Sequence, residues 1–188
     1  MDNYKELVRA AIRARRMAYA PYSRFYVGAA ILSTDGRIFT GCNVENAAYG
    51  AGICGERTAV FKAVSEGAQE FEAIAVCGGS AEIDVMLAGE TVTGRSDRDL
   101  TSVGQSDEKR PGGMVDRAGC PELPGRCVEH ATIVDELPLT SPCGICRQAL
   151  YEFGGDDLNV LLVQGEDRWT EMRLGELLKL GFGPKNLA

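Results

Sequence analysis

The chain has 188 residues, of which 45% are hydrophobic and 25% are charged, a balance that is ordinary for a globular domain with one substantial core. Its formal net charge of -7 argues against a general affinity for nucleic acid, since binding to polyphosphate needs clustered lysine and arginine. The sequence has neither an apolar run of membrane-spanning length nor a signal-peptide core at its N-terminus, so we expect a cytoplasmic protein without membrane or nucleic-acid partners.

The first part of the chain predicts a helix followed by a β-hairpin. Apolar residues recur at helical spacing over residues 3–18, and Ala20-Pro21 then ends the pattern. Residues 25–32 are mostly apolar and suit a buried strand. The tight-turn signal Asp35-Gly36 leads from them into a second strand over residues 37–40, so we expect two antiparallel neighbours.

Two polar side chains follow the second strand at alternate positions. Asn43 and Glu45 flank Val44 and therefore share one face of an extended segment. They either decorate the end of a strand or bind the hydroxyl groups of a sugar, since an amide and a carboxylate together can donate to and accept from hydroxyls. The residues by themselves leave both interpretations open.

Three cysteines have the spacing of a metal site. Cys143 and Cys146 are separated by two residues, so their thiolates can close on one metal ion, and Cys54 supplies a third sulfur. Helix-like sequence follows each half, which places the sulfurs at helix starts, where unpaired N–H groups favour thiolates. Three protein ligands leave the fourth position of a zinc ion open for water, as in catalytic sites, and Glu56 lies where its carboxylate can face that position without being a ligand.

Two arginines bear on the charge of such a site, and further cysteines and one histidine on other ways to bind a metal. Three thiolates and a hydroxide exceed the charge of zinc, so we expect Arg57 or Arg147 to donate hydrogen bonds to the sulfurs. The alternative is a binding module without enzymatic activity, in which the remaining cysteines, His130 or the nearby carboxylate complete a closed zinc site. Cys120, Cys127 and His130 lack a fourth ligand at a convincing spacing, so we expect surface thiols and a solvated histidine there.

The second half of the chain predicts a long insertion within one domain spanning residues 1–188. Residues 74–77 suit a buried strand, whereas residues 78–138 carry clustered Gly, Ser, Asp, Arg and Pro with weak periodicity, as in a flexible segment or an extra subdomain. Helices are expected after Cys54 and after Cys146, strands at 159–163 and 168–172, and a short helix at 176–180. This order implies a three-layer α/β/α fold, with a mixed central sheet of about five strands and helices on both faces.

Most of the chain resembles one family, the small zinc cytidine deaminases of the homotetrameric, nucleoside-salvage type, which hold zinc through cysteines beside a non-ligand Glu. The resemblance is carried by Ala20-Pro21-Tyr22-Ser23, Val27-Gly28-Ala29-Ala30, Gly41-Cys42-Asn43-Val44-Glu45-Asn46-Ala47, Cys54-Gly55-Glu56-Arg57-Thr58-Ala59, Lys62-Ala63-Val64-Ser65-Glu66-Gly67, Ser141-Pro142-Cys143-Gly144 and Phe182-Gly183-Pro184. Two features depart from the family. Gly55 stands where the family usually has Ala, and residues 78–138 replace a short link.

The resemblance implies a complete set of site residues and a cytidine-deaminase-like fold. One zinc ion per chain would be bound by Cys54, Cys143 and Cys146, with Glu56 as the proton shuttle. The implied substrate contacts are Phe25 stacked on the pyrimidine, Asn43 and Glu45 on the ribose 3′-hydroxyl, Tyr49 near the sugar, a backbone group of Gly55 at the base, and Phe182 bordering a site across a subunit interface. The resemblance also implies a homotetramer with its sites near the subunit interfaces.

The implied activity is the hydrolytic deamination of cytidine and 2′-deoxycytidine to uridine and 2′-deoxyuridine with release of ammonia, a step of pyrimidine salvage. A zinc-bound hydroxide would attack the amino-bearing carbon while Glu56 transfers protons. Another cytosine compound, such as a nucleoside antibiotic or a cytosine in a polynucleotide, is the alternative substrate. A 3′-hydroxyl held by Asn43 and Glu45 leaves no room for a continuing strand, and this favours a free nucleoside.

Overall fold

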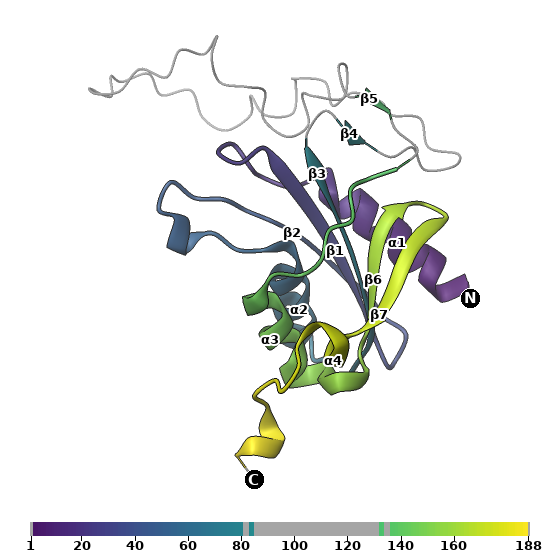
Figure 1. Cartoon of the computed structure of the whole chain (residues 1–188), viewed down its shortest axis with the longest axis vertical. Coiled ribbons are helices and arrows are strands. Elements are labelled where there is room, and N and C mark those ends of the chain that lie inside the picture. The colour runs from purple at the N-terminus through teal and green to yellow at the C-terminus, as the bar shows by residue number, and fades with distance from the viewer. Residues whose placement is uncertain (1, 81–82, 85–131, 134–135, 188) are drawn as a thin grey trace.

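The computed structural model describes residues 2–80, 83–84, 132–133 and 136–187 (Figure 1). The helices are α1 (Asp2–Arg15), α2 (Gly55–Ser65), α3 (Gly144–Gly154) and α4 (Leu174–Leu177), with short 3-10 helices η1 (Tyr49–Ala51), η4 (Gly155–Asp157) and η5 (Pro184–Asn186). The strands are β1 (Phe25–Ser33), β2 (Ile38–Cys42), β3 (Phe71–Ser80), β4 (Ile83–Asp84), β5 (Thr132–Ile133), β6 (Asn159–Gly165) and β7 (Arg168–Arg173).

Five strands form one mixed sheet in the order β2-β1-β3-β6-β7. Strand β1 is antiparallel to both β2 and β3, β3 runs parallel to β6, and β6 is antiparallel to β7. The central strands β3 and β6 are buried along nearly their whole length, which is typical of a sheet covered on both faces. A separate parallel pair is formed by β4 and β5. The predicted mixed sheet of about five strands is confirmed.

Two hydrophobic cores lie on opposite faces of the sheet. On one face Leu7 and Ile12 of α1 belong to one buried cluster with residues of the sheet, among them Leu161 of β6. On the other face Val60 of α2 and Leu150 of α3 pack together with residues of the same strands. Figure 1 shows α1 on one side of the strands and α2, α3 and α4 on the other, which confirms the three-layer arrangement.

Two glycines in neighbouring strands set how closely the helices approach the sheet. A Cβ atom at Gly28 of β1 would lie 2.2 Å from the carbonyl oxygen of Ala11 in α1. A Cβ atom at Gly41 of β2 would lie 2.4 Å from the amide nitrogen of Ala59 and 2.5 Å from the carbonyl oxygen of Gly55, both in α2. Since the obstacles are backbone atoms, only glycine fits at either position without moving a helix.

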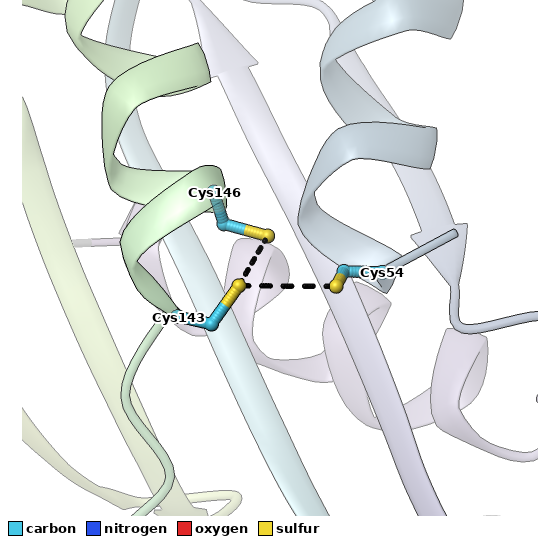
Figure 2. Close-up of side chains that lie close together, drawn as sticks. All are labelled: Cys54, Cys143 and Cys146. Carbon is cyan, nitrogen blue, oxygen red and sulfur yellow. Dashed lines mark hydrogen bonds between the residues drawn. The ribbon is translucent and has the colours of Figure 1, made fainter. Parts of the chain in front are cut away.

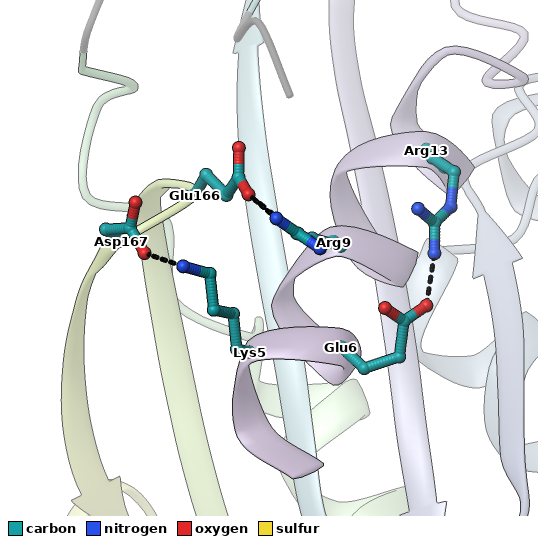
Figure 3. Close-up of polar contacts among 6 residues, drawn as sticks. All are labelled: Lys5, Glu6, Arg9, Arg13, Glu166 and Asp167. Atoms are coloured by element: carbon teal, nitrogen blue, oxygen red, sulfur yellow. Dashed lines mark hydrogen bonds and ion pairs between the residues drawn. The ribbon is translucent and has the colours of Figure 1, made fainter. Parts of the chain in front are cut away.

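Ion pairs fasten α1 to the turn between β6 and β7, as Figure 3 shows. Lys5 lies 2.6 Å from Asp167, and Arg9 donates hydrogen bonds to the nearly buried carboxylate of Glu166. The exposed pair of Lys5 and Asp167 contributes at most about 1 kcal/mol, so the packing of α1 depends mainly on its apolar face and on Arg9.

Two predicted boundaries differ from the structure. Strand β3 runs to Ser80 and not only to residue 77, because Gly78 and Gly79 stay paired with β1. The last helix spans Leu174–Leu177 and not residues 176–180, because the Glu176 carboxylate accepts a hydrogen bond from the backbone N–H of Arg173 at 2.7 Å and so starts the helix earlier.

Most of the expected insertion, including Cys120, Cys127 and His130, lies outside the described residues. Within the described ranges, no helix has the length and apolar character to cross a membrane.

Candidate active site

The three predicted metal ligands converge between the N-terminal ends of α2 and α3 (Figure 2). Sulfur Sγ of Cys143 lies 3.9 Å from that of Cys54 and 3.5 Å from that of Cys146. A tetrahedral zinc ion with Zn–S bonds of about 2.3 Å requires sulfurs about 3.8 Å apart. The cluster therefore has the dimensions for one zinc ion.

The local fold explains why these sulfurs meet. Cys54 and Cys143 are the N-cap residues of α2 and α3, both with extended backbone, and Cys146 lies in the first turn of α3. The two helices pack against each other on one face of the sheet (Figure 1). The sulfurs consequently lie at two helix starts, where the positive end of the dipole stabilises negative charge.

The surroundings of the sulfurs favour a thiolate at Cys54. The hydrogen bond from Cys146 and, after it, the hydrogen bond and positive charge of Arg57 together lower the pKa of the Cys54 thiol to about 5. The hydrogen bond between Cys54 and Cys146, together with burial, raises the pKa of Cys146. Atom Nη2 of Arg57 lies 3.7 Å from Sγ of Cys54. Arg57 thus occupies the position expected for a donor to the sulfurs.

The second arginine has a different position. The guanidinium group of Arg147 donates to the carbonyl oxygens of Pro142 and Leu177, each at 2.7 Å, and to Oγ of Ser141 at 3.2 Å. Among the described residues, no hydrogen bond from Arg147 to a sulfur is found, so Arg57 is the one of the two arginines that donates to the cluster. Arg147 instead braces the segment that leads into Cys143 against the end of α4.

Glu56 lies in the first turn of α2 and is only 4% exposed. Burial is the largest cause that raises the pKa of its carboxyl group, and the negative charge of Cys54 raises it further. A carboxyl group with a raised pKa beside a metal site can take up a proton and return it, which is the property needed for general acid–base catalysis.

The expected sugar-binding residues adjoin the cysteine cluster through the backbone. Val44 pairs with Ile53, the residue before Cys54, through two backbone hydrogen bonds of 3.0 and 2.9 Å. A Cβ atom at Gly55 would lie 3.2 Å from the carbonyl oxygen of Val27 and 3.3 Å from the amide nitrogen of Asn43. Gly55 therefore fills the narrow space between the metal cluster and the segment that carries Asn43.

Phe25, Asn43 and Glu45 form one hydrogen-bonded group. Oδ1 of Asn43 accepts from the backbone N–H of Val27 at 2.8 Å, and Nδ2 donates to the carbonyl oxygen of Phe25 at 2.9 Å. The Glu45 carboxylate accepts from the Ser23 hydroxyl and from the backbone N–H groups of Tyr22 and Ser23. Phe25 is 40% exposed, so part of its ring is accessible for stacking.

Tyr49 and Phe182 lie on projecting segments. Tyr49 begins η1 in the excursion between β2 and α2, which Figure 1 shows extending from the body of the domain. Phe182 lies in the C-terminal segment, is 57% exposed, and its carbonyl oxygen accepts a hydrogen bond from Gln148 at 2.5 Å. The expected contact of these residues with a site across a subunit interface stays a prediction.

Sequence reasoning missed two residues of this region. The Ser23 hydroxyl joins Glu45 to the segment of Phe25, although from the sequence Ser23 stands out only as the last residue of a motif that carries the family resemblance. The side chain of Thr140 lies beside Phe25, since both would touch the same Cβ atom at Gly78. No local pattern reveals either contact, because each joins segments that are far apart in the chain.

The comparisons with known proteins agree with this geometry. A family model described as the cytidine and deoxycytidylate deaminase zinc-binding region matches residues 1–86, which include Cys54 and Glu56. A cytidine deaminase of Sporosarcina psychrophila is 31% identical over 184 residues, covering 98% of this chain and 94% of the relative. One of Mycobacterium tuberculosis is 32% identical over 178 residues, covering 94% and 87%.

Solved structures give the same result at the level of the fold. The cytidine deaminase of Burkholderia pseudomallei matches with a TM-score of 0.59 and 33% identity, covering 94% of this chain and 97% of that one. The cytidine deaminase of Mycobacterium tuberculosis matches with a TM-score of 0.57 and 30% identity, covering 96% and 97%. With identity above 30% along nearly the full length of its relatives, this chain belongs to the cytidine deaminase family, a family of zinc-dependent hydrolases.

Proposed function

We propose that the protein catalyses the hydrolytic deamination of cytidine and 2′-deoxycytidine to uridine and 2′-deoxyuridine, with release of ammonia, in pyrimidine salvage. The observation that carries this proposal is the buried carboxyl group of Glu56 next to a cluster of three sulfurs with zinc dimensions. The names of the relatives support cytidine as the substrate.

Cys54, Cys143 and Cys146 would hold one zinc ion, which when bound supplies Lewis acidity that makes a water molecule acidic at neutral pH. Arg57 offsets the excess negative charge of the sulfurs through its hydrogen bond to Cys54. Arg147 holds the loop before Cys143 in place from one side. In this way the chain supplies three thiolates and leaves room for water.

Glu56 carries the proton chemistry. Its carboxylate accepts a proton from the attacking water and delivers it to the ring nitrogen beside the amino-bearing carbon of cytosine. It then takes up the remaining proton of the hydroxyl group now attached to that carbon and passes it to the amino group, so that ammonia leaves and the carbonyl group of uridine forms. The raised pKa of Glu56, caused mainly by burial, suits a group that must hold a proton between these two transfers.

The remaining residues orient the nucleoside. Phe25 offers its exposed ring to the pyrimidine, and a backbone group of Gly55 faces the base. Asn43 and Glu45 bind the 3′-hydroxyl of the sugar with the hydrogen-bonding capacity that their contacts within the chain leave free. Since these contacts do not read the 2′ position, the enzyme accepts both cytidine and deoxycytidine.

The proposed assembly is a homotetramer with its sites near the subunit interfaces. Exposed apolar side chains on α2 and α3, the helices that carry the cysteine cluster, support this assembly. Phe61 of α2 is 51% exposed and Ile145 of α3 is 65% exposed, and a subunit interface would cover them. In the tetramer, Tyr49 approaches the sugar and Phe182 borders a neighbouring site. A cytoplasmic location is part of the same proposal.

We further propose one domain over residues 1–188 that carries an insertion within residues 78–138. Both ends of this range contact the sheet, which supports a single domain. Arg15 donates to the carbonyl oxygen of Ser80 at 2.5 Å, and the N–H of Leu137 donates to the carbonyl oxygen of Gln164 at 2.5 Å. By these contacts the insertion proper begins after Ser80 and ends before Glu136.

The test is an ultraviolet assay on cytidine and deoxycytidine, with the zinc content of the purified protein determined in parallel. Glu56→Gln is expected to keep its zinc and lose about 10²- to 10⁴-fold in kcat, the usual contribution of general acid–base catalysis. Glu66→Gln, at the exposed end of the same helix, is the matched control with unchanged activity. Full activity of Glu56→Gln with zinc bound would contradict the proposal, and turnover of single-stranded RNA or a nucleoside antibiotic in place of cytidine would redirect it.

A further inference from the structure

The segment that presents Phe25 has an unusual backbone and few apolar anchors. Arg24, the residue before Phe25, has a φ of 54°, in the left-handed region that residues other than glycine seldom adopt. Tyr22, Ser23 and Arg24 are all exposed, so burial does not hold the turn. A conformation of this kind persists only where other interactions fix it.

Ser23 provides such interactions on two sides. Its hydroxyl group donates a hydrogen bond to Oε1 of Glu45 and accepts one from the backbone N–H of Phe25 at 3.0 Å. The other carboxylate oxygen of Glu45 accepts from the backbone N–H groups of Tyr22 at 3.0 Å and Ser23 at 3.2 Å. The Glu45 carboxylate is therefore the centre around which residues 22–25 turn.

Asn43 secures the other end of the same unit. Its amide group bonds both the carbonyl oxygen of Phe25 and the N–H of Val27, and its backbone N–H donates to the carbonyl oxygen of Val27 at 3.1 Å. These three bonds extend the ladder between β1 and β2 beyond the end of β2. Phe25 thus lies between a fixed Val27 and a turn that is held by the backbone bond from the N–H of Arg24 to the carbonyl oxygen of Ala20 at 3.0 Å and by the contacts of Ser23 with Glu45 and Phe25.

We propose that Ser23 is a positioning residue that couples recognition of the sugar to recognition of the base, because one hydroxyl group ties the Glu45 carboxylate to the backbone of Phe25. This inference rests on the proposed function, in which Glu45 binds the 3′-hydroxyl and Phe25 stacks on the pyrimidine. Any shift of the carboxylate upon binding of the sugar passes through Ser23 to the ring of Phe25. A nucleoside with both parts in place is consequently bound better than the separate contacts predict.

The charge state of Glu45 agrees with this arrangement. Partial burial acts to raise the pKa of Glu45, but the hydrogen bonds from Ser23 and Tyr22 outweigh it and lower the pKa. The carboxylate is ionised at neutral pH and accepts charge-assisted hydrogen bonds, which are about twice as strong as neutral ones. Removal of the Ser23 hydroxyl takes away one of these bonds and frees the N–H of Phe25.

The experiment compares kcat and KM for cytidine and for 3′-deoxycytidine, which lacks the hydroxyl that Glu45 binds. Wild-type protein, Ser23→Ala, Ser23→Thr and the control Ser65→Ala are measured. Ser65 is matched because its exposed hydroxyl also makes one hydrogen bond, to the carbonyl oxygen of Lys62 at 2.8 Å. We expect Ser23→Ala to reduce the preference for cytidine over 3′-deoxycytidine at least about tenfold, the lower end of the effect of one hydrogen bond to a charged group.

The remaining outcomes separate positioning from simple stability. In Ser23→Ala the loss is expected in KM, with kcat for cytidine within about twofold because the zinc site and Glu56 are untouched. Ser23→Thr is expected to restore most of the preference, and Ser65→Ala to behave as wild type. Equal losses on both nucleosides, together with earlier thermal unfolding, would show that Ser23 only stabilises the turn and would overturn the proposal.

A second measurement does not depend on turnover. The carboxyl carbon of Glu45 is titrated by NMR in wild type and in Ser23→Ala, and its pKa is expected to rise in the variant. If wild-type protein fails to deaminate cytidine, the proposed function is wrong, while this titration still decides whether Ser23 holds the carboxylate. An unchanged titration would refute the contact on which the coupling depends.

Discussion

Gly41 determines how closely α2 approaches the sheet, so Gly41→Ala tests whether the zinc site depends on that distance. The added Cβ atom would lie 2.4 Å from the amide nitrogen of Ala59 and 2.5 Å from the carbonyl oxygen of Gly55, whereas ordinary contacts begin at 3.4 Å. Helix α2 must therefore move away from β2 by about 1 Å, since the obstacles are backbone atoms. Overpacking of this kind costs about 1–3 kcal/mol of the free energy of unfolding.

The same displacement acts on the metal cluster. Cys54 moves with α2, whereas Cys143 and Cys146 stay with α3, so the sulfur of Cys54 leaves its place by several times the roughly 0.2 Å that metal–ligand distances tolerate. We expect the zinc affinity of Gly41→Ala to fall at least about tenfold, the lower end of what disturbed metal sites lose.

The assay pairs denaturant unfolding with competition for zinc by a chelator. Gly50→Ala is the control, since its Cβ atom would meet nothing within 4 Å. Gly28→Ala is a second comparison, because its Cβ atom would strike α1 at 2.2 Å from Ala11 and should lower stability without weakening zinc. If Gly41→Ala kept its free energy of unfolding within about 0.5 kcal/mol and bound zinc as wild type does, the reasoning from helix distance would be refuted.

Other changes probe the core, the sulfurs and the loop before Cys143. Leu150→Ala should lower the free energy of unfolding by about 2–5 kcal/mol in denaturant, whereas Glu152→Ala, which alters an exposed residue of the same helix, should change it by less than about 0.5 kcal/mol. In zinc-free protein, alkylation of Cys54 by iodoacetamide should stay fast as the pH falls and slow only near the pKa of about 5, because the thiolate is the reactive form. Arg57→Gln should move the midpoint of this pH profile upward. An unchanged midpoint would show that Arg57 does not lower the pKa of Cys54. In the chelator assay, Arg147→Lys should lose nearly as much affinity for zinc as Arg147→Ala, because one ammonium group cannot reach the three acceptors of the guanidinium group. Wild-type affinity in Arg147→Lys would show that these three hydrogen bonds do not position Cys143.

The sequence predicts the cysteine cluster well because its constraints are local. Two sulfurs three residues apart at a helix start must lie together, and Cys54 at a second helix start completes the set once the helices pack on one face. Strands were also predictable where apolar runs end in turns, as in the hairpin of β1 and β2. The residues that form the cysteine cluster can therefore be identified from short segments of the sequence.

What the sequence does not predict depends on contacts between distant segments. Gly78 and Gly79 suggest a turn, but in the structure Phe25 and Thr140 cover the first glycine and Leu137 covers the second, so the strand continues. The contact of Ser23 with Glu45 joins positions 22 residues apart, and a serine in a turn has many possible acceptors. Charge alone does not decide which of Arg57 and Arg147 donates to a sulfur, and in the structure nearby carbonyl oxygens take the donors of Arg147.

Zinc is expected to contribute to the fold as well as to the chemistry, because its ligands come from two helices that otherwise share few polar contacts. Without the metal, sulfurs 3.5 to 3.9 Å apart cannot all be ionised, and the pKa of Cys146 is raised by Cys54 and by burial. Zinc binding replaces the repulsion between neighbouring thiolates with three metal–sulfur bonds that join α2 to α3.

Removal of zinc by a chelator should therefore lower the melting temperature, and at a free zinc concentration 1,000 times Kd the metal adds about 4 kcal/mol to the free energy of unfolding. The zinc-dependent rise in melting temperature should disappear in Cys54→Ser and persist in Cys42→Ala, whose sulfur lies outside the cluster. A melting temperature of wild-type protein that does not respond to zinc would show that the two helices are held together by apolar packing alone.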